Sequence, residues 1–216
     1  MKLVITGPKC SGKSILGKGL ADLFSIPFHE TDLMIEDLYI AKYGSSLSCR
    51  AICSQYGEDF FRTLEKEVIA NIGKLNNCII STGGSTMLNK DSRMILRENS
   101  FLILITVSLE ILFKRLSAKE IPGYLNNKAA LDMYAARACL VTETVKPFAD
   151  ILVDSSDLSY EETINGIVQE LLSLITSLRK SIAHKLKFLE DCQTISQGSE
   201  INKEPDLNIL KLALKL

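Results

Sequence analysis

Short apolar runs alternate with longer stretches of mixed apolar and polar residues through most of the chain. The runs predict five β-strands, at residues 3–5, 27–29, 78–81, 101–107 and 151–153. The fourth run, FLILITV, is almost wholly apolar, which is typical of a central parallel strand covered on both faces. Helical periodicity between the runs predicts helices at 13–24, 58–75, 109–116, 128–145 and 160–175. This alternation predicts a five-stranded parallel sheet with helices on both faces, an α/β fold in three layers.

Two segments depart from this alternation. The polar stretch at 117–127, SAKEIPGYLNN, is either a mobile lid over a site or a surface loop. After residue 176 the apolar positions no longer follow the pattern of the sheet domain, and residues 178, 182, 186 and 189 form one stripe. We therefore expect a domain at 1–176 and a helical C-terminal extension and tail at 177–216. The extension either packs on the domain or binds a partner.

The composition narrows the class of protein. The chain has 216 residues, 46% of them hydrophobic and 24% charged, as in a soluble globular protein. A net charge of -1 provides no basic field for nucleic acid or for an anionic membrane. The sequence contains neither a signal peptide nor an apolar stretch near the roughly 18 residues of a membrane span. Its six cysteines form no metal-binding pattern and suit a reducing compartment. We expect a cytoplasmic monomer whose tail could contact a partner.

The segment GPKCSGKS, residues 7–14, lies between the first predicted strand and the first predicted helix, and it matches the phosphate-loop pattern GxxxxGK[ST]. Backbone N–H groups of such a loop face the phosphates of a nucleotide. We expect Lys13 to bridge the β- and γ-phosphates of ATP and Ser14 to offer its hydroxyl group to Mg²⁺. The predicted nucleotide-binding residues of this segment and of the position after it are Gly7, Cys10, Ser11, Gly12, Lys13, Ser14 and Ile15.

Other motifs favour a kinase over a switch GTPase. No N-K-x-D motif for reading a guanine base occurs, and the strand at 78–81 ends in Ser-Thr-Gly-Gly instead of an aspartate. The carboxylate that usually stands on the Mg²⁺ side of a phosphate-loop site must therefore come from another part of the chain. Glu30 and Asp32 lie two positions apart at a strand end, where one could order Mg²⁺ through water and the other could orient or deprotonate an acceptor hydroxyl.

Two further patterns concern the acceptor. Arg62 and Glu65 lie three positions apart on one predicted helix. Either they form a surface ion pair, or Arg62 binds the carboxylate of a substrate and Glu65 fixes its orientation. Gly83 and Gly84 end a strand, where glycines let a ligand approach bare backbone N–H groups.

In this order the phosphate loop, the acid pair, F-R-x-x-E and the glycine turn resemble the shikimate kinase family over about residues 1–176. The resemblance implies a P-loop fold with a closing lid, and transfer of the ATP γ-phosphate to the 3-hydroxyl of shikimate in chorismate biosynthesis. It implies catalytic roles for Lys13 and Asp32. By position it also implies shikimate binding by Asp32, Arg62, Gly83, Gly84 and Arg137, metal binding by Ser14, Glu30 and Ser81, and adenine contacts by Asp154 and Ser155.

The chain departs from the family pattern at three places. Cys10 and Ser85 stand where the family has glycines, and the lid reads Ile-Pro-Gly-Tyr-Leu at 121–125, without the family's arginine. Lys119 and Lys128 are the nearest lysines in sequence. These departures keep two alternatives open: a kinase for another small hydroxylated acid or a nucleotide, and a catalytically weakened nucleotide-binding module that acts through its tail.

Overall fold

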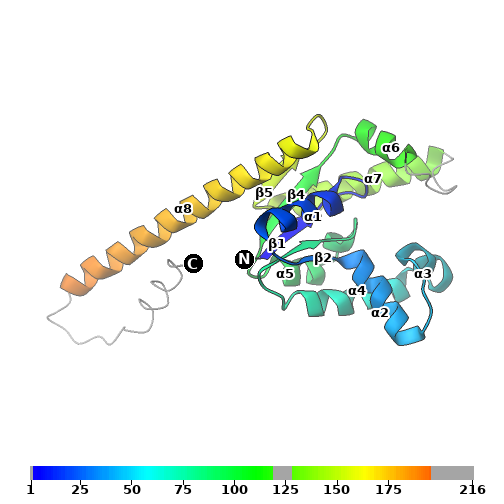
Figure 1. Cartoon of the computed structure of the whole chain (residues 1–216), viewed down its shortest axis with the longest axis horizontal. Coiled ribbons are helices and arrows are strands. Elements are labelled where there is room, and N and C mark those ends of the chain that lie inside the picture. Colours follow the sequence, from blue (N-terminus) through cyan, green and yellow to red (C-terminus); the bar gives the residue numbers. More distant parts are fainter. Residues whose placement is uncertain (1, 119–127, 196–216) are drawn as a thin grey trace. The chain divides into compact units, whose positions relative to one another are not determined.

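The structure is a computed structural model, and it describes residues 2–118 and 128–195 (Figure 1). The chain divides into two compact units, the first being Met1–Gly166 and the second beginning at Ile167. The predicted lid segment from residue 119 to 127 and the predicted tail from residue 196 lie outside the described residues.

The first unit contains a sheet of five parallel strands, as predicted (Figure 1). Its order, β2-β3-β1-β4-β5, places β1 between strands that come later in the chain, so the chain crosses over in both directions from β1. In parallel sheets this switch point is where ligands bind, beyond the carboxyl ends of the strands. The strands are β1 (Lys2–Thr6), β2 (Phe28–Glu30), β3 (Cys78–Ser81), β4 (Phe101–Thr106) and β5 (Ile151–Asp154).

Eight α-helices and two short 3₁₀ segments are described along the chain, and every predicted helix is present. Hydroxyl and amide side chains cap the N-termini of several helices. For example, Ser108 accepts a hydrogen bond from the Ile111 N–H group at the start of α6. The helices are α1 (Lys13–Phe24), α2 (Thr31–Tyr43), α3 (Cys49–Tyr56), α4 (Glu58–Ile72), α5 (Lys90–Arg97), α6 (Leu109–Ser117), α7 (Lys128–Val145) and α8 (Tyr160–Ile195), with 3₁₀ segments η1 (Thr86–Leu88) and η2 (Lys146–Phe148).

The core lies on both faces of the sheet, because alternate residues of a strand point to opposite faces. One face packs against α4, α5 and α7 through a cluster of fully buried residues. On the other face α1 approaches closely, since a Cβ atom on Gly17 would lie 2.6 Å from the Phe28 ring and 3.4 Å from Ile5. The first cluster includes Val4, Ile69, Ile72, Ile80, Leu96, Leu102, Leu104, Val141 and Val145.

Helices α2, α3 and α4 have a small core of their own. Ile35 and Tyr39 of α2 pack with Ile52 of α3 and with Leu64 and Val68 of α4, and all five are buried. Figure 1 shows these three helices gathered side by side. This helical group carries residues 58, 62 and 65, and it is fixed to the sheet through α4, whose Ile69 and Ile72 belong to the main core.

The last helix is longer than predicted. The prediction ended it at residue 175, but α8 runs as one helix from Tyr160 to Ile195. It begins in a capping box, in which the Glu162 N–H donates to Ser159 Oγ and the Ser159 N–H donates to Glu162 Oε2. No glycine or proline occurs between residues 167 and 195 to end it. The separate extension from residue 177 that the sequence suggested is therefore a continuation of the same helix as far as residue 195.

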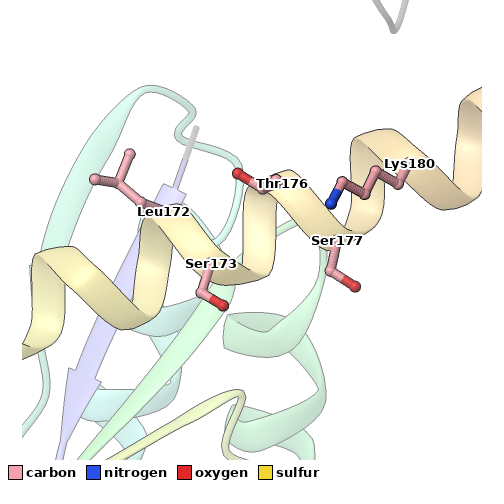
Figure 2. A pocket seen from close by; sticks show the side chains of 5 residues that line it. All are labelled: Leu172, Ser173, Thr176, Ser177 and Lys180. Atoms are coloured by element: carbon pink, nitrogen blue, oxygen red, sulfur yellow. The ribbon is translucent and has the colours of Figure 1, made fainter.

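Part of α8 also borders a hollow of about 380 Å³. Its lining residues are spread along two turns of this one helix, as Figure 2 shows, and none of them is a predicted site residue. They are Leu172, Ser173, Thr176, Ser177 and Lys180. Among the described residues, no helix is long and apolar enough to cross a membrane.

Candidate active site

The phosphate loop joins β1 to α1 at the switch point of the sheet. A Cβ atom on Gly7 would lie 2.2 Å from the carbonyl oxygen of Ile105 in β4, so only glycine fits there. Gly12 caps α1 with φ +98°, a backbone conformation that glycine adopts without strain. Cys10 also has a positive φ, +66°, where a side chain is rarely tolerated. The loop therefore has the shape of a phosphate loop, with local strain at Cys10.

Lys13 and Ser14, at the start of α1, occupy the positions predicted for phosphate and metal binding. Lys13 is buried, and its ammonium group donates to the Pro8 carbonyl at 2.7 Å. Burial lowers the pKa of Lys13 to about 8, although the nearby Asp32 opposes the shift. Ser14 Oγ donates a hydrogen bond to Glu30 Oε1. The structure thus brings Ser14 together with Glu30, one of the two predicted acids.

Asp32, the other predicted acid, lies in the first turn of α2, against the glycine turn that follows β3. The Gly83 N–H donates to Thr31 Oγ1 at 2.8 Å, and a Cβ atom on Gly83 would lie 2.6 Å from Asp32 Oδ1. Burial raises the pKa of Asp32, and the charge of Lys13 opposes this rise. The carboxylate is therefore held between the phosphate loop and the glycine turn.

The oxygen atoms near Ser14 suit a magnesium ion. Ser81, at the end of β3, pairs in register with Glu30 of β2, and its buried hydroxyl group has no hydrogen-bond partner in the described part of the chain. The described residues contain no group of three His, Cys, Asp or Glu side chains that could hold a metal ion by themselves. Mg²⁺ fits such a place, because it keeps several waters and binds through few protein oxygens and the phosphates of a nucleotide.

Arg62 on α4 and Arg137 on α7, the two predicted substrate arginines, meet at one carboxylate. Glu58 accepts from Arg62 at 2.9 Å, and Arg137 lies 3.6 Å from the same oxygen. The hydrogen bond from Arg62 lowers the pKa of Glu58. Arg62 also donates to Glu65 at 2.7 Å, and the buried Glu65 accepts from Thr86 at 2.7 Å. Glu65 thus fixes Arg62 to η1, which follows the glycine turn.

The predicted adenine-binding loop follows β5. Asp154 accepts from the Ser156 N–H at 3.0 Å, and the Ser155 N–H donates to Thr106. Arg115 of α6 donates to the carbonyl groups of Ser11 and Ser155, both at 3.2 Å, and so connects this loop to the phosphate loop. Sequence reasoning missed Arg115, because no motif marks it and its partners are far away along the chain.

The remaining predicted residues lie in different surroundings. The side chain of Ile15 is 64% exposed on α1, and Lys128 is an exposed residue at the start of α7. Lys119 lies outside the described residues. Tyr134 of α7 was also missed. Its hydroxyl group donates to the Lys9 carbonyl at 2.6 Å and so connects α7 to the phosphate loop.

A parallel sheet in this order, with a phosphate loop after β1 and an acid and two arginines around it, defines a P-loop kinase of the kind that acts on small molecules. The model of the shikimate kinase family matches residues 9–172. The chain therefore belongs to the shikimate kinase family, and ATP is a substrate of that family.

Relatives and solved structures agree with this assignment. The shikimate kinase of Geobacter sulfurreducens is 31% identical over 168 residues, which cover 76% of this chain and 87% of that protein. The shikimate kinase of Aquifex aeolicus has a TM-score of 0.66 at 28% identity and covers 79% of this chain and 96% of its own. The shikimate kinase of Acinetobacter baumannii, solved in complex with shikimate, has a TM-score of 0.69 at 20% identity, covers 80% of this chain and 93% of its own, and supports the fold.

Proposed function

We propose that this chain is a shikimate kinase, which transfers the γ-phosphate of ATP to the 3-hydroxyl of shikimate. The observation that carries the proposal is the meeting of Arg62 and Arg137 at one carboxylate oxygen of Glu58. Two guanidinium groups that converge in this way suit the carboxylate of a small acid, which they can hold by charge-assisted hydrogen bonds. An acceptor with a carboxylate and a ring of hydroxyl groups uses both these arginines and Asp32.

In the proposed mechanism each group has a separate task. Lys13 binds the β- and γ-phosphates, and Arg62 and Arg137 bind the acceptor carboxylate. Asp32 orients the acceptor hydroxyl toward the γ-phosphate and accepts its proton, and its raised pKa makes it a stronger base than an exposed aspartate. Phosphoryl transfer requires little covalent chemistry from the protein, so positioning and charge stabilisation account for most of the catalysis.

We infer that the nucleotide is bound with Mg²⁺, which Ser14 would hold directly and Glu30 and Ser81 would hold through water. When it is bound, the ion neutralises charge on the β- and γ-phosphate oxygens. The hydrogen bond from Ser14 to Glu30 and the unpartnered hydroxyl group of Ser81 among the described residues support this role. Gly84 offers its backbone N–H group to the acceptor. The Gly83 N–H is bound to Thr31, so Gly83 serves the acceptor by leaving room beside Asp32. Asp154 and Ser155 border the adenine.

The proposal is tested by the release of ADP from purified protein with ATP and Mg²⁺. Shikimate, gluconate and nucleoside monophosphates are added in separate reactions. We expect ADP release to depend on shikimate. Release that depends on gluconate or on a nucleotide would show that the protein acts on another acceptor. If no acceptor stimulates release, the protein is a catalytically weakened nucleotide-binding module.

The carboxylate site is tested by Arg62→Ala, with Arg179→Ala on the exposed part of α8 as the matched control. We expect Arg62→Ala to raise KM for shikimate about 100-fold or more, because it removes a hydrogen bond between charged groups and leaves Glu65 buried without its cation. KM for ATP is expected to change less than about threefold. Equal effects on the two KM values would contradict this role of Arg62.

We further propose that residues 1–176 contain the catalytic machinery, that the chain is a monomer, and that it acts in the cytoplasm, where ATP is available. Five cysteines of the described part of the chain are free thiols, which suits a reducing compartment. Deletion of residues 177–216 is expected to leave kcat for shikimate phosphorylation unchanged. The sedimentation behaviour of the full chain and of the shortened chain would show whether the extension contacts a second copy.

A further inference from the structure

The proposed reaction, on which this inference rests, brings two anions into a site that is already rich in acid. The side chains described at the candidate site include four carboxylates and three cations proposed to bind the ligands, so these groups do not offset the charge of ATP and an acidic acceptor. The segment at 119–127 contains a lysine but no arginine. The carboxylates are Glu30, Asp32, Glu58 and Glu65, and the cations are Lys13, Arg62 and Arg137.

Lys9 is a further cation at this site, and its backbone is in contact with two other elements. A Cβ atom on Gly84 would lie 3.1 Å from the Lys9 backbone nitrogen and 3.3 Å from the Lys9 Cβ, so the glycine turn packs directly against this residue. From the other side Tyr134 Oη donates to the Lys9 carbonyl at 2.6 Å. Tyr134 lies one helical turn before Arg137 on α7. Lys9 therefore stands between the glycine turn and the helix that carries an acceptor-binding arginine.

The side chain of Lys9 is available for a ligand. The residue is exposed, and its ammonium group makes no hydrogen bond or ion pair with any residue that the structure describes. Its charge nevertheless acts on the site. Burial is the main cause of the raised pKa of Asp32 and of the lowered pKa of Lys13, and Lys9 lowers both values. The ammonium group is thus within electrostatic range of the proposed base and of the phosphate-binding lysine.

We propose that Lys9 is a catalytic residue whose ammonium group binds the transferring phosphoryl group from the acceptor side, opposite Lys13. In the reaction an acceptor oxygen forms a bond to the γ-phosphorus, while the bond from that phosphorus to the oxygen of ADP breaks. The hydroxyl proton passes to Asp32, and the electron pair of the broken bond leaves with ADP. Lys9 keeps its protons throughout and offsets the charge on the equatorial phosphoryl oxygens.

The experiment compares Lys9→Met, which keeps most of the apolar stem, with Lys9→Arg, which restores the charge. Lys18→Met, at an exposed position on α1, is the matched control. Lys119→Met and Lys128→Met test the two lysines nearest in sequence to residues 121–125. Each variant is assayed for kcat with saturating ATP and shikimate. Binding of MgADP alone, and of shikimate in the presence of MgADP and aluminium fluoride, is measured by calorimetry.

We expect Lys9→Met to lower kcat about 100-fold or more and to weaken the complex with aluminium fluoride, while its affinity for MgADP alone stays within about threefold. Lys9→Arg is expected to recover at least about a tenth of the wild-type kcat. The three other lysine variants are expected to have a kcat close to that of the wild type. A kcat within about threefold of wild type in Lys9→Met would overturn the inference. Lost MgADP binding in that variant would also overturn it, since the role of Lys9 would then be to shape the phosphate loop.

The wild-type reaction in the same assay separates this inference from the proposed function. If the wild type releases no ADP with shikimate, the proposed function fails. If the wild type is active and Lys9→Met is equally active, the function stands and the role of Lys9 is refuted. A loss of kcat in Lys119→Met together with full activity in Lys9→Met would show that Lys119, and not Lys9, supplies the positive charge at the phosphoryl group.

Discussion

Replacing Glu65 by glutamine removes one buried charge while keeping the shape of the side chain. Glu65 is 3% exposed, and its two oxygens accept from Arg62 and from Thr86, each at 2.7 Å. A glutamine can still accept from Arg62 and donate to the Thr86 hydroxyl, so the variant loses the charge of the bond but not the bond itself. The bond from Arg62 keeps its cation, whereas the bond with Thr86 becomes one between neutral groups. A hydrogen bond to a charged group contributes about 1.5–3 kcal/mol and a neutral one about 0.5–1.5 kcal/mol. The expected loss is therefore about 1–1.5 kcal/mol.

This loss is expected at the acceptor, because Glu65 fixes the arginine that binds the acceptor carboxylate. A change of about 1.4 kcal/mol is tenfold in an equilibrium constant. We expect Glu65→Gln to raise KM for shikimate about tenfold and to leave KM for ATP within about twofold. Glu65→Ala leaves Arg62 and Thr86 without this partner. We therefore expect it to raise KM for shikimate about 100-fold and to lower the melting temperature.

The assay is steady-state ADP release with each substrate varied in turn, followed by thermal unfolding of the same samples. Glu67→Gln is the matched control, because Glu67 lies on the same helix and pairs at the surface with Lys42. Such an exposed pair contributes about 0–1 kcal/mol, so this variant is expected to behave as wild type. The reasoning would be refuted if both Glu65 variants kept the wild-type KM for shikimate, or if KM for ATP rose equally.

Three further predictions concern the phosphate loop and the glycine turn. Because burial lowers the pKa of Lys13 to about 8 and phosphate binding requires its charged form, kcat/KM for ATP is expected to fall about tenfold per pH unit as the pH rises above 8. A fall that starts only above pH 10 would contradict this. Gly83→Ala is expected to lower kcat more than about tenfold, because the added Cβ would lie 2.6 Å from Asp32 Oδ1 and would displace the carboxylate. An unchanged kcat would show that catalysis does not require Asp32 at its present position. Cys10→Gly relieves a positive φ and is expected to stabilise the fold by about 1 kcal/mol, seen as a melting temperature about 2–4 °C higher; a lower melting temperature would argue against strain at this residue.

The elements that sequence predicts well are those with strong periodicity and clear ends. The apolar run of β4 and the helix from Lys128 to Val145 appear as predicted, apart from one residue at the end of the strand. The end of α8 was wrong, because the sheet pattern stops near residue 175 while the helix continues without a breaking residue. A change in the partner of a helix face does not itself end a helix, so periodicity alone could not locate that boundary.

The candidate site was predicted where a local motif carries the chemistry. The loop from Gly7 to Ser14 and the spacing of Arg62 and Glu65 can be read from neighbouring positions. Contacts between distant elements could not be read in this way. Glu58 belongs to none of the sequence motifs, and only the fold places Arg137 beside it. Lys9 lies at a variable position of the phosphate-loop pattern, and Tyr134, which binds its carbonyl group, is 125 positions away.

The two hydrogen bonds that α6 and α7 make to the phosphate loop have a thermodynamic consequence. Arg115 and Tyr134 hold the loop at Ser11 and Lys9, and their helices are the two that the chain connects through residues 119–127. Because α7 also carries Arg137, which is proposed to bind the acceptor, we expect a ligand at one place to change the free energy of binding at the other. Such linkage is reciprocal, so the factor by which ATP changes the affinity for the acceptor must equal the factor by which the acceptor changes the affinity for ATP.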